Sequence, residues 1–438
     1  MAGGTFTVQN KVRPGAYINF KSAGKPLGTL ADRGIMTMPL ALKWGPSKTP
    51  IEITAETDVQ EVLGYSLLDP ELLLIKEAAK RASKILLYRL NDGTKATATV
   101  EPLTITARYG GTRGNAISVT LTEDVDAEGT FKVVTLLDGR PVHEQLGKKV
   151  EDLENNHFVT FSGTGALAAS SGAPLTNGTD TEAETQSYLD YFKAIEVLTW
   201  NTMAIPTKDS TVKGAAVSFI KRMREEEGKK VQGVLENYPT ADYEGIISVK
   251  NGVKLTDGTI IDAVKATAWV AAATAGAEVN ESNTYTTYDD SVDVDVRYTN
   301  TQIIEALQKG EFVFVEQGGK AVVEQDINTL TSFTADKDKS FRKNRVIRVL
   351  DAIGNDINTI FSQYYLGSTD NHADGRKLFK GECINYLDTL QGISAIQNFD
   401  STKDVEVLPG QESDAVVTNI YVQPVDSMEK LYMTVTVR

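Results

Sequence analysis

The sequence predicts a multidomain protein of mixed α+β and α/β type, with an α/β core, an inserted β-domain and extended strand arms at both ends. Its 438 residues exceed what one ordinary hydrophobic core organises, so about two to four domains are expected. Short apolar strands alternate with amphipathic helices on both sides of a stretch that is rich in Thr, Val and Gly. The chain then ends on an alternating apolar run, which is typical of a strand rather than of a frayed terminus.

Residues 1–32 are predicted to form an N-terminal arm, because Gly, Lys and Thr dominate and little in this stretch can build a core. A turn at Arg13–Gly15 is followed by one short alternating segment that contains Tyr17, Ile18 and Phe20. Fully stretched, about 20 residues could reach ~65 Å, which is enough to pass a neighbouring domain. The arm is therefore a candidate connector.

Residues 33–100 are predicted to belong to the α/β core. The expected elements are strands at Ile35–Leu42 and Ile85–Leu90, and helices at Asp58–Leu63 and Pro70–Ser83. The Asn91–Thr94 stretch is a strong turn signal and closes this part.

Residues 101–180 change character and are predicted to form the inserted, peripheral β-domain. Helical periodicity disappears, and alternating apolar runs are separated by turns such as Asp138-Gly139. The expected strands lie at Leu103–Thr106, Ile117–Leu121 and Phe131–Leu136. From Gly163 to Asp180 small residues predominate, which indicates a linker.

Residues 181–340 return to alternating strands and helices, which implies a partly parallel sheet covered by helices. The expected helices are Thr185–Ala194, Val212–Glu227, Ala263–Ala275 and Thr301–Lys309. The expected strands are Val197–Trp200, Lys230–Leu235, Ile246–Val249 and Phe312–Val315, the last continuing through Gly318-Gly319 into a hairpin with Ala321–Val323.

Residues 341–427 are predicted to form a C-terminal helical and β domain, with helices at 345–365 and 373–390 and strands at 403–408 and 416–423. Residues 428–438 follow as a strand of their own. Its apolar face is formed by Leu431, Met433, Val435 and Val437. Such a strand either docks on its own domain or adds to a sheet of a neighbouring molecule, and the pattern alone leaves both possible.

Composition excludes several classes of protein. The net charge of -14 argues against nucleic-acid binding, which needs a basic face. No stretch reaches the ~18 apolar residues of a membrane helix, and the first residues lack the pattern of a secretory signal. A single cysteine, Cys383, excludes an internal disulfide and indicates folding in a reducing cytoplasm.

No residue pattern indicates a catalytic, cofactor or metal site. The three histidines, His143, His157 and His372, lie in different segments, and His372 is expected to cap a helix start. The Gly110–Asn115 loop lacks the ending of a phosphate loop, and Asp289–Asp295 lacks the glycine and distal glutamate of a calcium loop. We interpret them as a tight turn and a solvated strand. Cys383 is interpreted as an inert buried thiol, and the three tryptophans, Trp44, Trp200 and Trp269, as core residues.

The order of these parts resembles the tail sheath proteins of contractile-tailed phages, especially the shorter kind from phages and phage-like particles of Gram-positive bacteria. The resemblance covers essentially the whole chain. It rests on the Arg13–Ile18 arm, the Ala107–Ile117 segment with its Gly-Asn loop, the Arg-rich helix start Phe341–Asp351 and the terminal strand.

The resemblance implies a structural role without catalysis or cofactor. Sheath subunits form six-membered rings stacked helically around a tail tube, with terminal arms adding strands to neighbouring subunits. A trigger from the baseplate makes the sheath shorten and drive the tube through the cell envelope. The implied partners are other copies of the chain, the tube, baseplate and tail terminator proteins, with no nucleic acid and no direct membrane binding. The implied place is a virion tail or phage-like particle assembled in the bacterial cytoplasm.

Two sets of residues are candidates for assembly contacts. Strand addition between subunits is expected to use Tyr17, Ile18, Phe20, Val416, Ile420, Val422, Leu431, Met433, Val435 and Val437. The cations Arg342, Lys343, Arg345 and Arg348 could face the tube or an adjoining subunit. The alternative for these four is a solvated helix face that balances Asp336, Asp338 and Asp351.

Three other functions remain open at this point. A sheath from a phage-derived bacteriocin would look the same in sequence. An α/β enzyme would use residues 181–340, where no catalytic cluster is visible. A surface-array protein would need an export signal, and the chain shows none.

Overall fold

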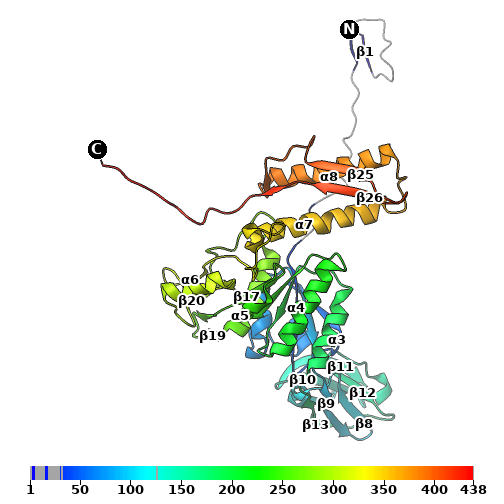
Figure 1. Cartoon of the computed structure of the whole chain (residues 1–438). Coiled ribbons are helices and arrows are strands. Elements are labelled where there is room, and N and C mark those ends of the chain that lie inside the picture. The colour runs from blue at the N-terminus through cyan, green and yellow to red at the C-terminus, as the bar shows by residue number, and fades with distance from the viewer. Residues whose placement is uncertain (1, 5–14, 18–29, 31–32, 125–126, 438) are drawn as a thin grey trace. The chain divides into compact units, whose positions relative to one another are not determined.

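The structure is a computed structural model, and it describes residues 2–4, 15–17, 30, 33–124 and 127–437 (Figure 1). The chain forms two compact units. We call residues 31–355 and 424–438 the main unit, and residues 1–30 and 356–423 the terminal unit.

A seven-stranded sheet organises the main unit, with strand order β21-β17-β16-β15-β3-β5-β4. Neighbouring strands pair in parallel, except that β4 is antiparallel to β5. In chain order the strands are β3 (Ile35–Leu40), β4 (Pro50–Thr54), β5 (Lys84–Arg89), β15 (Thr202–Ile205), β16 (Gln232–Glu236), β17 (Ile246–Val249) and β21 (Glu311–Phe312). Because β3 lies between β5 and β15, segments from both sides of the β-rich stretch share one sheet.

Helices cover both faces of this sheet. Alternation along β5 divides its side chains, so that Ile85 and Leu87 lie in one core cluster and Leu86 and Tyr88 in the other. The first cluster includes residues of α2 (Leu73–Ala79) and α5 (Ala263–Gly276), and the second includes residues of α3 (Thr185–Glu196) and α4 (Ser210–Glu225). Alanines let α5 pack closely against both the sheet and α2, so it is buried nearly all round.

Residues 93–180 form a β module with its own core. One sheet has the order β12-β8-β7 and the other β11-β10-β9-β13. The strands are β7 (Thr97–Val100), β8 (Leu103–Ala107), β9 (Ile117–Glu123), β10 (Phe131–Leu137), β11 (Arg140–Gly147), β12 (Val159–Ser162) and β13 (Ser170–Pro174). Trp44, from the loop after β3, is buried in this core and stacks on Phe158.

The base of the β module is closed where the chain enters and leaves it. Strand β6 (Gly93–Thr94) pairs with β14 (Thr179–Asp180), and Asn115 exchanges two hydrogen bonds with the backbone of Gly178. Gly111 has φ +138°, and a Cβ there would lie 2.0 Å from the carbonyl oxygen of Lys43. The Gly110–Asn115 loop therefore serves close packing, as its interpretation as a tight turn predicted.

The rest of the main unit consists of short elements and the start of a long helix. The elements are α1 (Val59–Leu63), β18 (Val253–Leu255), β19 (Ile260–Ile261), β20 (Ser291–Val294), α6 (Asn300–Gln308), β22 (Phe314–Glu316), β23 (Ala321–Val323) and α7 (Asn344–Ile360). The predicted hairpin at Gly318-Gly319 is confirmed by the antiparallel pairing of β22 with β23. Asp58 caps α1 by accepting hydrogen bonds from two backbone amides of its first turn.

The terminal unit is built from a long helix and a hairpin. Its elements are β1 (Ala2–Gly4), β2 (Gly15–Tyr17), the end of α7 with its π-helical turn Phe361–Tyr365, α8 (Ala373–Gly392), β24 (Ile396–Gln397), β25 (Val405–Pro409) and β26 (Val416–Ile420); β27 (Gln423–Pro424) marks the boundary. His372 caps α8, as predicted, because its Nδ1 accepts a hydrogen bond from Gly375 N at 2.9 Å. β25 pairs with β26 and packs against α8.

One predicted strand is wrong. The stretch Val197–Trp200 is no strand but the turn that ends α3, because the indole of Trp200 donates back to Ile195 O at 3.0 Å. The strand starts later, at Thr202. Residues 428–437 have no strand pairing within this chain, so their prediction as a strand donated to a neighbouring subunit stays a prediction. A strand needs another strand edge to pair with, and the alternating pattern does not identify that edge.

Candidate assembly interface

The C-terminal arm, residues 430–437, is exposed at every position. Its apolar face is exposed: Leu431 is 84% exposed, Met433 73%, Val435 75% and Val437 93%. Tyr432 on the other face is also exposed. A run of large apolar side chains that are this exposed is typical of a segment that binds a partner rather than of an ordinary solvent-facing surface.

Val416 and Ile420 lie within β26, where they pair with Pro409 and Val405 of the same chain, and Val422 follows just after the strand. One edge of β26 is therefore used inside the chain. In the described residues β25 and β26 form a two-stranded sheet, so each has an outer edge without a strand partner.

The predicted N-terminal connector falls mostly outside the described residues. The backbone of Tyr17 belongs to β2, which pairs in parallel with β1, whereas Ile18 and Phe20 lie outside what the structure describes.

The four predicted interface cations have different environments. Lys343 forms an ion pair with Glu429 and lies 3.8 Å from Asp426. Nε and Nη2 of Arg342 and Nε of Arg345 are buried and have no hydrogen-bond partner among the described residues. Burial lowers the pKa of both arginines. The prediction that Arg348 can face a partner is wrong for this structure, because its side chain is 0% exposed and pairs with Asp326.

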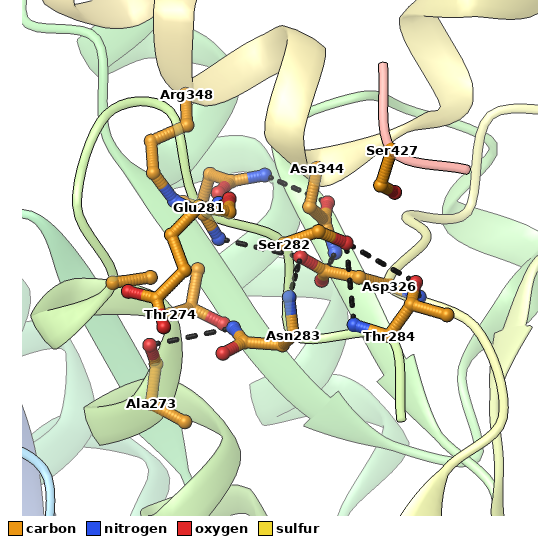
Figure 2. Close-up of polar contacts among 12 residues, drawn as sticks. Ala273, Thr274, Glu281, Ser282, Asn283, Thr284, Asp326, Asn344, Arg348 and Ser427 are labelled. Atoms are coloured by element: carbon orange, nitrogen blue, oxygen red, sulfur yellow. Dashed lines mark hydrogen bonds and ion pairs between the residues drawn. The ribbon is translucent and has the colours of Figure 1, made fainter. Parts of the chain in front are cut away.

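Asp326 is the centre of a buried polar network at the start of α7 (Figure 2). Its carboxylate accepts from Asn344 Nδ2 at 2.8 Å, Asn283 N at 3.0 Å and Arg348 Nη2 at 3.4 Å. Arg348 also donates to the carbonyl oxygen of Glu281. The helix start is thereby bound to two loops that are far away in sequence. The sequence showed these four cations but gave no sign of this carboxylate partner.

Glu429 is a second residue that the sequence analysis missed. Its side chain is 11% exposed, although both neighbours in sequence, Met428 and Lys430, are exposed. Glu429 lies on the wall of a cleft of about 990 Å³, together with Tyr285, Ile304, Leu307 and Arg342. The signal that could have drawn attention to it is a single acid placed directly before an apolar strand.

The residues considered for chemistry are structural. Asp289 is bound by Arg81 and Trp269, and Asp293 by Arg297, so the aspartate-rich stretch is paired with protein donors. In the described part of the chain no group of three or more His, Cys, Asp or Glu could hold a metal ion. Cys383 is buried, and burial raises the pKa of its thiol to about 12. No described helix is long and apolar enough to cross a membrane.

Family models match almost the full length of the chain. They are the tail sheath domain III N-terminal region at residues 33–90, the phage tail sheath β-sandwich domain at 91–180, the phage tail sheath central domain at 181–329 and the phage tail sheath C-terminal domain at 336–438. The second of these corresponds to the β module.

Individual proteins agree with these models. The chain is 40% identical to the phage-like element PBSX protein XkdK of Bacillus subtilis (strain 168), over 100% of both chains. It is 56% identical to the sheath tail protein of Desulfitobacterium hafniense, whose crystal structure matches with a TM-score of 0.87 over 96% of this chain and 99% of that one.

The helical sheath of the anti-feeding prophage in its contracted state is similar in fold, with a TM-score of 0.59 over 97% of this chain and 99% of that one at 14% identity. The chain thus belongs to the phage tail sheath protein family, and it is a structural component of a phage tail or phage-like particle rather than an enzyme.

Proposed function

We propose that this chain is the subunit of a contractile tail sheath, which polymerises as stacked hexameric rings around a tail tube. On contraction the sheath drives the tube through the bacterial envelope. Its partners are further copies of itself, the tail tube, and the baseplate and tail terminator proteins. Family membership supports the role, and the fold shared with a contracted helical sheath supports the contraction.

The exposed apolar face of the C-terminal arm is the observation that carries this proposal. Ordering one residue costs about 1–2 kcal/mol, whereas one backbone hydrogen bond contributes about 1 kcal/mol. Backbone pairing alone therefore does not hold a donated strand. Burying a side chain such as Leu431 or Val435 contributes about 1.5–3 kcal/mol more, so the alternating apolar residues decide the balance.

Both hairpin edges and the N-terminal arm complete the proposed lattice. The outer edges of β25 and β26 would accept strands from neighbouring subunits, with Val416, Ile420 and Val422 at or beside the paired segment. Tyr17, Ile18 and Phe20 would add a second connector. Strand addition suits a contracting polymer, because its hydrogen bonds hold while the chain before it bends.

Arg342, Lys343 and Arg345 would meet an acidic group of the tube or an adjoining subunit. The buried donor nitrogens of Arg342 and Arg345, which lack an acceptor among the described residues, support this part of the proposal, because a buried N–H without an acceptor costs about 1–3 kcal/mol. A carboxylate from a partner would supply the acceptor that the described residues lack.

Removing residues 428–438 tests the central claim. We expect a folded monomer, with a cooperative melt, that forms no striated tubes or rings in negative-stain micrographs where the full chain forms them. A truncated chain that loses cooperative folding would instead show that the arm docks on its own molecule, and normal tubes would refute strand donation.

The second candidate is the sheath of a bacteriocin-like particle. The relative named as a phage-like element protein favours it. Particles purified from the source would decide the matter, since a phage carries this sheath below a head filled with its own genome, whereas a bacteriocin particle carries no such genome.

A further inference from the structure

The C-terminal segment changes from a mostly buried to an exposed side chain within two residues. The side chain of Glu429 is 11% exposed, whereas Leu431 is 84% exposed. The preceding residue, Met428, is fully exposed, so burial in an apolar core does not hold the segment. The Glu429 carboxylate hydrogen-bonds to the main unit, and the nearby Asp426 lies 3.8 Å from Lys343.

Every side chain that binds this carboxylate is a hydrogen-bond donor. From other segments, Thr284 Oγ1 donates to Oε1 at 3.0 Å, Gln325 Nε2 donates to Oε2 at 2.6 Å, and Lys343 Nζ donates to Oε2. The local Ser427 Oγ donates to Oε1 at 3.4 Å. We call Thr284, Gln325, Lys343 and Glu429 the Glu429 clasp. Burial by itself would raise the pKa of Glu429, but the hydrogen bonds from Lys343 and Gln325 outweigh it and lower the pKa. The carboxylate is therefore charged at neutral pH.

The donors of the clasp are fixed in turn by the network at α7. The Thr284 hydroxyl has one proton and two acceptor positions. It accepts from Asp326 N at 3.0 Å and from the Ser282 hydroxyl at 3.2 Å, so its proton is left for Glu429. Asp326 is the carboxylate that binds Asn344 and Arg348 (Figure 2). The clasp is thus linked through Asp326 to the start of α7.

We propose that the Glu429 clasp positions the C-terminal arm, by fixing the residue at which it leaves the main unit. The proposal rests on the proposed function, in which the arm pairs with a neighbouring subunit. With the clasp closed, the strand searches for its partner from a fixed origin. With the clasp open, the tether lengthens back towards Pro424, by about five residues or ~17 Å, and the effective concentration of the arm at its partner falls.

A label beside the clasp tests the first step in the free monomer. Met428→Cys carries a spin label at an exposed site, and Cys383 stays unlabelled because it is buried and its thiol pKa is raised to about 12. Glu429→Gln is nearly isosteric, but its amide must place an NH₂ against donors. We expect the slow component of the label's motion to be lost in Glu429→Gln. Its retention would overturn the clasp.

Two matched controls separate the clasp from general damage. Asp426→Asn removes an exposed acid 3.8 Å from the same lysine and should leave the slow component unchanged. Thr284→Ser keeps the hydroxyl donor and should behave like the parent chain, whereas Thr284→Val should behave like Glu429→Gln. Equal effects from serine and valine would count against the hydrogen-bond explanation.

Assembly measures the second step. The critical concentration for polymerisation should rise about tenfold in Glu429→Gln and stay unchanged in Asp426→Asn. A loose label with an unchanged critical concentration would refute the positioning role. Normal polymerisation of the chain that lacks residues 428–438 would refute the proposed strand donation instead, whatever the label shows.

Discussion

A second carboxyl, that of Glu324, lies half-buried near the Glu429 clasp. It lines the same cleft as Glu429, and burial raises its pKa, with the neighbouring Glu429 carboxylate adding to the effect. Its folded-state pKa therefore lies above its unfolded value, so ionising it costs stability. That cost is complete above the folded pKa and absent below the unfolded value of about 4.3.

Glu324→Gln is accordingly expected to raise the melting temperature at pH 7. The advantage should shrink as the pH falls through the folded pKa of Glu324, because the native carboxyl is then neutral as well. Differential scanning calorimetry between pH 4 and 8 measures this. Glu305→Gln, on the exposed face of α6, is the control and should change the melting temperature little at any pH. A destabilised Glu324→Gln at pH 7 would contradict the sign.

At the scale of elements, local sequence patterns predicted what local forces decide. The strand predicted at Ile85–Leu90 and the cap predicted at His372 follow from neighbours within a few residues, so these predictions are confirmed. The strand predicted at Val197–Trp200 is wrong, because the packing of Trp200 back onto α3 overrides its strand propensity. The pairing of Arg348 with Asp326 could not be predicted, because a spacing of three residues on a helix says nothing about a loop that arrives from elsewhere.

Helix α7 offers a prediction of its own, because it carries two arginines three residues apart, of which Arg348 is fully buried against Asp326 and Arg345 is half-buried. Arg348→Ala should lower the free energy of unfolding by roughly 3 kcal/mol, since it leaves the Asp326 carboxylate buried without its cation. Arg345→Glu should leave the stability of the monomer nearly unchanged but prevent assembly around the tube. Assembly of the unmutated chain around the tube should weaken as the salt concentration rises. Urea titration and sedimentation with tube measure the two effects. Normal tube-bound sheath from Arg345→Glu would rule out its interface role.

At the scale of the whole molecule, the β module is an insert whose removal the structure makes plausible. It has its own core, and its entrance and exit are adjacent through the pairing of Gly93–Thr94 with Thr179–Asp180. The seven-stranded sheet includes no strand from the module. From sequence, the change in composition indicated an insert at residues 101–180, whereas the β module already begins at Gly93. The pairing at its base depends on residues about 85 positions apart, which no local pattern reveals.

Replacing residues 95–178 with a short Gly-Ser turn is therefore expected to leave ordered tubes. The cut removes the cover over Trp44 and the contacts of Arg113, which donates to Gly64 O at 2.7 Å and lies over the ring of Tyr65. It also removes His157, which lies 3.7 Å from Glu61. The excised chain should accordingly carry Trp44→Gln as well, because an exposed indole promotes association. The same excision with Trp44 retained is the control, and it should fold but associate without order. Circular dichroism reports folding and negative-stain microscopy reports tubes. A folded excised chain that forms no tubes would show that the β module supplies contacts the lattice needs.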